Sequence, residues 1–316
     1  MLYQYCGRRQ VRETHISHAT MASSGCQDYT VRTMRPEEVE ETYQLIDKEG
    51  WNLSVDKFSA LHKCFPNNFF VAVTQDGEVA GTMSLFPTFE GEFVLGNIVV
   101  KDGHRYKGLG RKIVDDVFAL FPNAVVSLTA VPGADQFYIN TGFTLTQPQQ
   151  GHDIFYLLLD RERLKAKSRE TGQQGVTVSL YDGCGLDDLV AYDREARGYE
   201  NRTYVAMQVQ CFKVATARNS TDQLVGFGVA FIKREKIVLD GLYADSDAIA
   251  TQIFTEIIEQ FPDRNSMKLQ VPSSRLFLSE LGEIESSYKY NRYSKGQPTL
   301  SPLSKVYNVA DCDYTY

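Results

Sequence analysis

Two glycines one residue apart and five basic side chains occur together in the segment Lys101–Val117, KDGHRYKGLGRKIVDDV. Gly108 and Gly110 would let a ligand come close to the backbone, because glycine has no side chain to obstruct it. The apolar spacing that follows predicts a helix, and the free amides at its N-terminus would face the same ligand. The segment therefore predicts a site for a phosphate group. Its basic residues are Lys101, Arg105, Lys107, Arg111 and Lys112.

Two common phosphate-binding motifs do not fit this loop. A Walker A loop ends in lysine followed by serine or threonine, and that ending is missing here. The dinucleotide fingerprint has a third glycine at the position where this chain has Ile113. An enzyme that handles nucleotide phosphates is therefore the least favoured of three hypotheses.

The loop resembles the acetyl-coenzyme A loop of the GNAT acyltransferase superfamily, whose pattern is Gln/Arg-x-x-Gly-x-Gly/Ala. Here the pattern reads RYKGLG at residues 105–110, directly after an expected strand that ends at Val100. The segment Ala134–Phe143, ADQFYINTGF, resembles the superfamily's Ala-x-x-x-Tyr-x-x-x-Gly-Phe segment. The resemblance covers about Tyr29 to Asp160. With EGWN at residues 49–52, it extends to a group of two-domain GNAT proteins.

This resemblance implies an N-acetyltransferase that takes acetyl-CoA as co-substrate and uses no metal. Tyr138 would be the catalytic general acid that protonates the departing thiolate, and its alternative role is to pack its ring on the sheet. A backbone amide of Val99 or Val100 would polarise the thioester carbonyl. The implied acetyl-CoA-binding residues are Ile98, Val99, Val100, Arg105, Lys107, Gly108, Leu109, Gly110, Arg111 and Lys112.

The general base is not assigned by the sequence. An attacking amine with a pKa of roughly 10 must lose a proton. Many GNAT enzymes carry a glutamate on the strand before the loop, where this chain has Gly96 and Asn97. Glu92, Asp102 and His104 are nearby but read more readily as solvated loop residues. A water chain or a side chain of the second half stays open.

The acceptor is equally open between a small-molecule amine and a protein amine. The missing strand glutamate favours the main alternative, a non-catalytic acyl-CoA-binding sensor or scaffold protein, whereas Tyr138 speaks against it. Trp51 follows the first predicted helix, where GNAT proteins commonly build the acceptor pocket. By residue type alone, a tryptophan is more often part of the core.

Composition limits the class of partner. The chain has 316 residues, 43% of them hydrophobic, and a formal net charge of −7. General nucleic-acid or anionic-membrane binders usually have a broad basic surface, so neither nucleic acid nor membrane is expected as a partner. Six scattered cysteines without a CxxC pair predict free thiols in a reducing compartment, and no apolar run reaches the roughly 20 residues of a spanning helix. We expect a cytoplasmic protein.

Residues 1–28 are predicted to be a disordered leader. They contain Arg8, Arg9 and Arg12 but lack the apolar core of a secretory signal. A mitochondrial presequence is disfavoured because no clear amphipathic stripe is present. Translation from Met1 and from Met21 both stay open.

The chain repeats itself with a period near 140 residues, which predicts two domains of one fold. Three segments match in the same order: Glu78–Phe86 with Gln223–Phe231, Phe93–Val100 with Ile237–Ala244, and Phe121–Pro132 with Phe261–Pro272. We predict a catalytic domain at residues 29–160, a charged linker at residues 161–175 and a degenerate domain at residues 176–316.

Each half is predicted to be an α/β fold with a mixed, mostly antiparallel sheet flanked by helices. One helix should run from Pro36 to Gly50 and another from the glycine loop to Pro122. The expected strands of the first half are residues 30–34, 69–74, 79–86, 93–100, 125–129, 143–145 and 154–159. At residues 244–251 the second half lacks the loop glycines and all basic groups, and we expect it not to bind coenzyme A. Asp240, Tyr243 and Tyr199 are candidates for a pocket between the halves.

Overall fold

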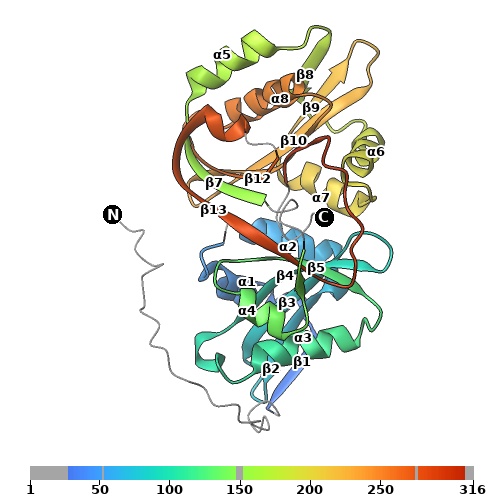
Figure 1. The fold of residues 1–316 in the computed structure, drawn as a ribbon, viewed down its shortest axis with the longest axis vertical. Coiled ribbons are helices and arrows are strands. Elements are labelled where there is room, and N and C mark those ends of the chain that lie inside the picture. Colours follow the sequence, from blue (N-terminus) through green and yellow to red (C-terminus); the bar gives the residue numbers. More distant parts are fainter. Residues whose placement is uncertain (1–27, 52, 147–151, 275–276, 310–316) are drawn as a thin grey trace.

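The computed structural model describes residues 28–51, 53–146, 152–274 and 277–309 of the chain. The predicted leader therefore lies outside the described residues, except for Asp28. The described part forms two halves stacked along the long axis of the molecule, each with helices packed against a twisted sheet (Figure 1). The mixed α/β architecture agrees with the predicted fold class.

The first half contains the elements from β1 to β6. Helix α2 was not predicted; Ser54 caps it by accepting a hydrogen bond from Lys57 N at 3.1 Å. The elements are β1 (Tyr29–Thr33), α1 (Val39–Asp47), α2 (Val55–Cys64), β2 (Phe69–Thr74), β3 (Val79–Pro87), β4 (Glu92–Val100), α3 (Leu109–Ala119), β5 (Val125–Ala130), α4 (Asp135–Asn140) and β6 (Thr144–Leu145).

The second half repeats this order. Strands β8 to β12 and helices α6, α7 and α8 follow the sequence of β1 to β5 with α1, α2 and α3. The remaining elements are β7 (His152–Leu159), α5 (Arg161–Thr171), β8 (Val176–Leu180), α6 (Leu186–Arg197), α7 (Arg202–Cys211), β9 (Lys213–Asn219), β10 (Leu224–Lys233), β11 (Lys236–Ala244), α8 (Asp247–Glu259), β12 (Ser266–Pro272), β13 (Gly282–Lys295) and β14 (Val306–Asn308).

The predicted charged linker is largely the helix α5. This helix packs against α8, and its Leu164 is buried. The polar composition of this segment concealed the helix, because Leu164 is the one side chain of α5 that is buried. The predicted strand at residues 143–145 is also shorter than expected, since β6 contains two residues.

The two halves exchange strands. The order across the sheet is β1-β2-β3-β4-β5-β13-β7-β12-β11-β10-β9-β8. Strand β7, from the first half of the sequence, pairs with β12, and β13, from the second, pairs with β5. Strand β13 also pairs with β7 at the centre of the molecule. Each half therefore completes its sheet with a strand of the other.

The sheet of the first half is covered on both faces. Phe69, Val71 and Val73 of β2 face a cluster that contains α1 and α2, whereas Phe70 and Ala72 face a cluster that contains α3. This alternation follows from the two-residue period of a strand. Helix α7 of the second half contributes Tyr204 and Met207 to the first cluster, so the core continues across the junction.

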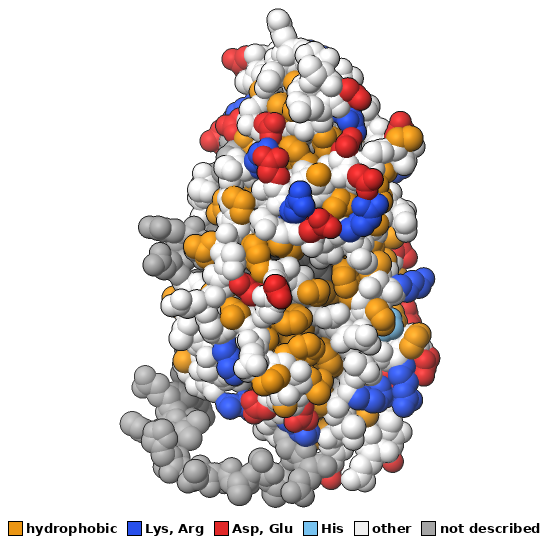
Figure 2. All heavy atoms as spheres, turned by 90° about the vertical axis from the view of Figure 1, so that its right-hand side faces the viewer, with side chains coloured by type: hydrophobic (Ala, Val, Ile, Leu, Met, Phe, Trp, Pro, Cys, Tyr) orange, Lys and Arg blue, Asp and Glu red, His pale blue; other side chains and the backbone are white. Residues whose placement is uncertain are grey.

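The surface is mixed in character. Figure 2 shows hydrophobic side chains gathered around a hollow at mid-height of one face, with charged side chains above and below it. In the described part of the chain, no helix is long and apolar enough to cross a membrane. Cys64, Cys184 and Cys211 are free thiols. Among the described residues, no group of three His, Cys, Asp or Glu side chains is placed to hold a metal ion.

Candidate active site

A gap opens in the sheet where β4 leaves β5. The two strands are parallel and pair from Glu92 to Leu95 of β4. The pairing of β4 with β3 continues to Val100 but shifts register on the way, and Asn97 has a φ of 52°. Asparagine adopts this left-handed conformation more readily than most residues. The bulge turns β4 away from β5, so the sheet is split beyond Leu95.

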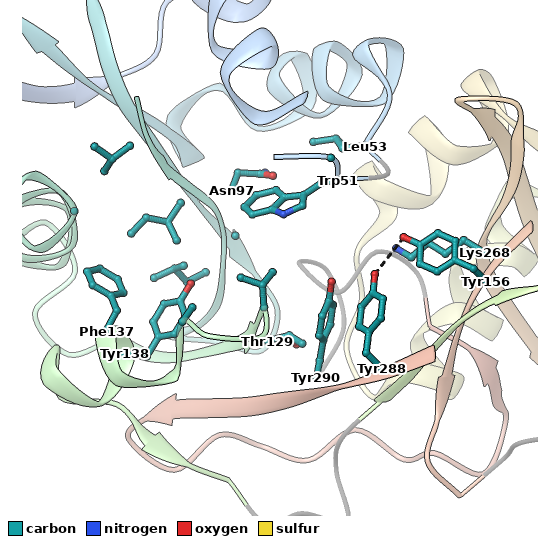
Figure 3. A pocket seen from close by; sticks show the side chains of 18 residues that line it. Trp51, Leu53, Asn97, Thr129, Phe137, Tyr138, Tyr156, Lys268, Tyr288 and Tyr290 are labelled. Carbon is teal, nitrogen blue, oxygen red and sulfur yellow. Dashed lines mark hydrogen bonds between the residues drawn. The ribbon is translucent and has the colours of Figure 1, made fainter. Parts of the chain in front are cut away.

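A cavity of about 240 Å³ lies in this gap (Figure 3). One end lies beside α3 and α4, and the other lies against β7, β12 and β13 of the exchanged strands. Described residues that line it are Gly50, Trp51, Leu53, Leu95, Gly96, Asn97, Ile98, Val100, Gly110, Thr129, Val131, Ala134, Phe137, Tyr138, Tyr156, Lys268, Tyr288 and Tyr290.

The backbone bonding of β4 distinguishes Val99 from Val100. Lys101 N donates to Ala80 O of β3 at 2.9 Å, and Val99 lies opposite Thr82. Successive N–H groups of a strand point to opposite sides, so the N–H of Val99 faces β3 and that of Val100 faces the gap. The side chains of Ile98 and Val100 line the cavity, whereas Val99 packs in the core with α1 and α2.

The glycine loop leads from β4 to the N-terminus of α3. Gly108 is the N-cap and has a φ of 81°, a conformation that suits glycine. A Cβ at Gly110 would lie 3.3 Å from Phe137 Cε2 and 3.7 Å from Val100 Cγ2, so this glycine keeps the loop close to the cavity wall. Leu109 is buried and anchors the first turn of α3. Gly110 lines the cavity, so the first turn of α3 borders it.

Arg105 braces the loop. Its Nε donates to Val100 O at 2.7 Å, and its guanidinium forms ion pairs with Glu49 and Asp102. The contact with Glu49 connects the glycine loop to the segment that carries Trp51. These bonds hold the end of β4, the loop and the segment after α1 in one arrangement.

The other basic side chains of the loop have local partners. Arg111 pairs with Asp115 at 2.7 Å and Lys112 with Asp116 at 2.8 Å, both one turn along α3. Lys107 Nζ donates to Gly103 O at 2.8 Å. Such partly exposed pairs are worth only about 0.3–0.5 kcal/mol in helices. Lys112 can therefore exchange its partner for a phosphate at little cost, whereas Arg111 also donates to Asn140 O of α4 at 2.7 Å.

Tyr138 lies on α4 and is 6% exposed, with its hydroxyl directed into the cavity (Figure 3). Strand β13 holds this helix in place, because Tyr293 Oη donates to Asp135 Oδ1 at 2.6 Å and Asn291 Nδ2 donates to the same oxygen at 3.0 Å. The hydrogen bonds of Tyr293 and Asn291 lower the pKa of Asp135. Burial and the bond to Asp135 raise the pKa of Tyr293 to about 12.

The far end of the cavity contains residues that the sequence analysis missed. Tyr156, Tyr288, Tyr290 and Lys268 come from three strands that meet only through the exchange. Tyr288 and Tyr156 are joined through their hydroxyl groups at 3.2 Å. The alternation of tyrosines at positions 288 and 290 is a signal for one strand face, but no local pattern indicates that this face meets Trp51. Trp51 lines the cavity and also contacts the core.

Asn97 occupies the centre of the cavity wall beside Trp51 (Figure 3). It is 3% exposed, and its Nδ2 donates to Ser84 Oγ at 3.0 Å. Its Oδ1 is buried without a hydrogen-bond partner among the described residues. A buried acceptor in this state is costly, which makes a bound donor favourable there.

The corresponding gap in the second half is filled by the chain itself. Strand β14 pairs with β11, and Asn308 Nδ2 donates to Leu239 O at 2.9 Å. On its other side, Gln270 N of β12 donates to Asn308 Oδ1 at 2.7 Å. Helix α8 begins with its own cap, because Ser246 Oγ accepts from Ile249 N, and Tyr307 Oη donates to Asp247 Oδ1 at 2.6 Å. The split of β11 and β12 is thus closed by protein.

The candidates at the junction lie outside the cavity lining. Asp240 is 1% exposed and pairs with Lys57 of α2 at 2.6 Å. Tyr243 is buried near Arg197 in the second half, and Tyr199 is buried against Phe89 of the first half, with ring centroids 5.1 Å apart. None of these three predicted pocket residues lines the cavity described above.

The chain is similar in sequence to known acyltransferases. Profiles described as acetyltransferase (GNAT) domains match residues 66–145 and, separately, residues 189–296. The holothin acyltransferase of Pseudoalteromonas sp. (strain SANK 73390) is 22% identical over 301 residues, which cover 91% of this chain and 96% of that protein.

Two solved structures share the fold over most of the chain. A Pyrococcus horikoshii protein has a TM-score of 0.70 at 16% identity and covers 95% of this chain and 100% of its own. A tandem GNAT protein from the clavulanic acid biosynthesis pathway has a TM-score of 0.62 at 14% identity. The match covers 86% of this chain and 100% of that protein. The two-domain arrangement seen here is thus shared with solved proteins.

Proposed function

The chain belongs to the GNAT acyltransferase superfamily, with two such domains in tandem, and we propose that it transfers an acetyl group from acetyl-CoA to an amine by direct attack. One observation carries this proposal: the split between β4 and β5, the first amides of α3 and the hydroxyl of Tyr138 meet in one cavity. Transfer from a thioester at the end of a long arm needs a free strand edge to bind the arm, amides to bind its phosphates and a proton donor for the sulfur.

The fit of acetyl-CoA rests on the free edge of β4. Ile98 and Val100 have N–H groups that point to the same side of β4. These groups would offer hydrogen bonds to the pantetheine arm, as to an added strand. Gly108, Leu109, Gly110 and Arg111 would present amides to the pyrophosphate at the start of α3. Lys107, Arg111 and Lys112 would supply charge. Arg105 would act by holding the loop, because its guanidinium is engaged with Val100, Glu49 and Asp102.

The residues of the chain would assist the transfer as follows. The N–H of Ile98 or Val100, whichever the pantetheine arm leaves free, would donate to the thioester oxygen, which becomes more negative as the amine nitrogen bonds to the carbonyl carbon. Tyr138 would give its phenolic proton to the sulfur as the carbon–sulfur bond breaks. The amine loses one N–H proton to water, and the Tyr138 phenolate takes one proton back from water, which balances the proton received by the thiol. Holding both reactants in one cavity supplies part of the rate by proximity.

The second half would not bind coenzyme A. Its gap is occupied by β14, and its helix α8 starts with the carboxylate of Asp247 already bonded to Tyr307. Its role would be to supply the far wall of the cavity through β7, β12 and β13. We also propose that the protein is cytoplasmic and that its domains have the boundaries predicted from the sequence.

The test is release of free thiol from acetyl-CoA across a panel of amines by wild type and Gly108→Glu. Gly108→Ala is the matched control, because it places a side chain at the same φ of 81° without the charge. We expect Gly108→Glu to lose acetyl-CoA binding in calorimetry and Gly108→Ala to retain it in large part. If the wild type binds acetyl-CoA but releases no thiol with any amine, the alternative of a non-catalytic acyl-CoA-binding protein takes its place.

A further inference from the structure

The end of the cavity away from α3 is lined by Trp51, Leu53, Asn97, Tyr156, Lys268 and Tyr288. We call it the acceptor chamber. It lies on the far side of Asn97 from Tyr138, with Trp51 above, the tyrosines of β13 below, and Tyr156 of β7 at the right beside Lys268 (Figure 3). An acceptor entering there would meet the thioester proposed beside Val100 and Tyr138. Its walls therefore indicate what kind of amine the protein accepts.

The chamber offers no counter-charge to a cation. Among the described residues that line the whole cavity, none is aspartate, glutamate or histidine. An ordinary alkylamine, with a pKa near that of lysine at about 10.4, enters as an ammonium ion at neutral pH. Its desolvation between Trp51 and the tyrosines would go uncompensated except by cation–π contact. An aromatic amine is neutral at this pH and avoids that cost.

The one cation among the described lining residues points to an anionic substituent. Lys268 is half-buried on β12, opposite Tyr156 in the pairing with β7. No carboxylate of the described residues lies within ion-pair distance of its ammonium. An acceptor with a carboxylate would complete this pair, while its ring would pack against Trp51 and the tyrosine cluster.

Asn97 completes the set at the reacting end. Its Oδ1 is buried beside Trp51 at the cavity wall without a hydrogen-bond partner among the described residues, and a small shift of either side chain would bring it to an acceptor amine. A neutral amide oxygen can accept a hydrogen bond from an N–H group but cannot take its proton at neutral pH. It therefore suits an amine that arrives uncharged and needs orientation rather than deprotonation before attack.

We propose that the acceptor chamber binds a weakly basic aromatic amine that bears a carboxylate, with its N–H bonded to Asn97 Oδ1 and its carboxylate paired with Lys268. This inference rests on the proposed N-acetyl transfer, whose acceptor it names by class. Asn97 is here a positioning residue for the amine, and Lys268 is a specificity-determining residue.

Calorimetric titration of the full chain, with free coenzyme A present so that no transfer occurs, tests the proposal with three probes. These are 3-aminobenzoate, 3-(aminomethyl)benzoate and 3-aminobenzamide, which differ in the basicity of the amine or in the charge of the substituent. We expect 3-aminobenzoate to bind about tenfold more tightly than either of the others, as one charge-assisted contact predicts. Equal or tighter binding of 3-(aminomethyl)benzoate would overturn the inference.

Three variants make the test specific. Lys268→Gln should weaken 3-aminobenzoate about tenfold and leave 3-aminobenzamide unchanged. Asn97→Asp places a charge beside the amine and should reverse the order of 3-aminobenzoate and 3-(aminomethyl)benzoate. Lys289→Gln is the control, because Lys289 stands between Tyr288 and Tyr290 on β13 and is exposed. An unchanged preference in Lys268→Gln would refute the role of Lys268.

Thiol release with the same amines separates this inference from the function on which it rests. If the expected binding order holds and no amine releases thiol, the transfer proposal is wrong and the chamber assignment stands. If alkylamines are acetylated while aromatic amines are neither bound nor acetylated, the transfer proposal stands and the inference is wrong.

Discussion

Tyr138 is the residue on which the proposed chemistry depends most directly. Its ring packs among Phe137, Phe143 and Tyr293, and its hydroxyl is directed into the cavity. Tyr138→Phe keeps this packing and removes the proton donor. We expect kcat for thiol release to fall by about 10²–10⁴-fold, with little change in acetyl-CoA affinity. Steady-state kinetics together with calorimetry would measure both quantities.

Tyr106→Phe is the matched control for this prediction. Tyr106 lies in the glycine loop and is fully exposed, with a φ of 61°. Removal of its hydroxyl should leave kcat within about twofold of wild type, as expected of an exposed group with no role in proton transfer. Equal losses in both variants would mean that the Tyr138 hydroxyl has no special role.

At the residue scale, sequence reasoning reached one end of the cavity and, at the other end, only the candidate Trp51. The glycine loop, Ile98 and Tyr138 lie close together along the chain, so local motifs indicate them. Tyr156 and Lys268 come from strands 112 positions apart in sequence that pair directly. No local periodicity encodes such a meeting, and a resemblance that ends at Asp160 cannot include Lys268.

At the scale of elements, β13 is the strand that positions α4. It crosses from the second half and reaches Asp135, three residues before Tyr138, through Tyr293 and Asn291. Tyr293→Phe removes the shorter of these two bonds. We expect the free energy of unfolding to fall by about 1 kcal/mol at pH 7, and kcat to fall with it. Denaturant titration and thiol release would measure the two effects.

The pH dependence of this contact has a defined sign. Because the folded state lowers the pKa of Asp135, its stabilising contribution is present above the ordinary value of about 4 and is lost as pH falls through the lowered pKa. The pKa of Tyr293 is raised to about 12, so its contribution is present below about pH 10 and is lost toward pH 12. The stability difference between wild type and Tyr293→Phe should therefore shrink at both extremes. A pH-independent difference would contradict this assignment.

The internal repeat was predictable at this scale, but the fate of its second gap was not. Aligned segments at residues 93–100 and 237–244 are the strands β4 and β11, as the repeat predicts. The closing strand β14 has only three residues and carries no pattern of its own. Its place between β11 and β12 depends on Asn308, which bonds to both.

Closure by β14 predicts one acetyl-CoA site per chain. Calorimetric titration of wild type should give a stoichiometry near one, because the backbone edge of β11 is already paired at Leu242 and Tyr243. In Gly108→Glu the heat of binding should disappear rather than halve. A stoichiometry near two would show that the second half also binds acetyl-CoA.

At the scale of the whole molecule, a buried ion pair joins the halves. Lys57 Nζ lies 2.6 Å from Asp240 Oδ1, and both side chains are 1% exposed. Tyr204 and Gln208 of α7 also donate to this carboxylate at 3.4 Å. Asp47 of α1 forms a second, more exposed contact with Lys233 and Arg234. The junction therefore combines ionic contacts with the apolar packing of α2 against α7.

Removing one member of the buried pair should be far more damaging than removing both. Lys57→Met leaves the Asp240 carboxylate without its counter-charge in the core, at a cost of about 3–5 kcal/mol. Lys57→Met combined with Asp240→Leu removes the buried charge as well and should recover most of that loss, less the bonds of Tyr204 and Gln208. Because β7 and β13 are exchanged, each half depends on a strand of the other, so unfolding should occur in one transition for all three proteins. Denaturant titration followed by circular dichroism measures these free energies. A Lys57→Met variant as stable as wild type would show that the junction does not couple the halves in this way. Two separated transitions would show the same.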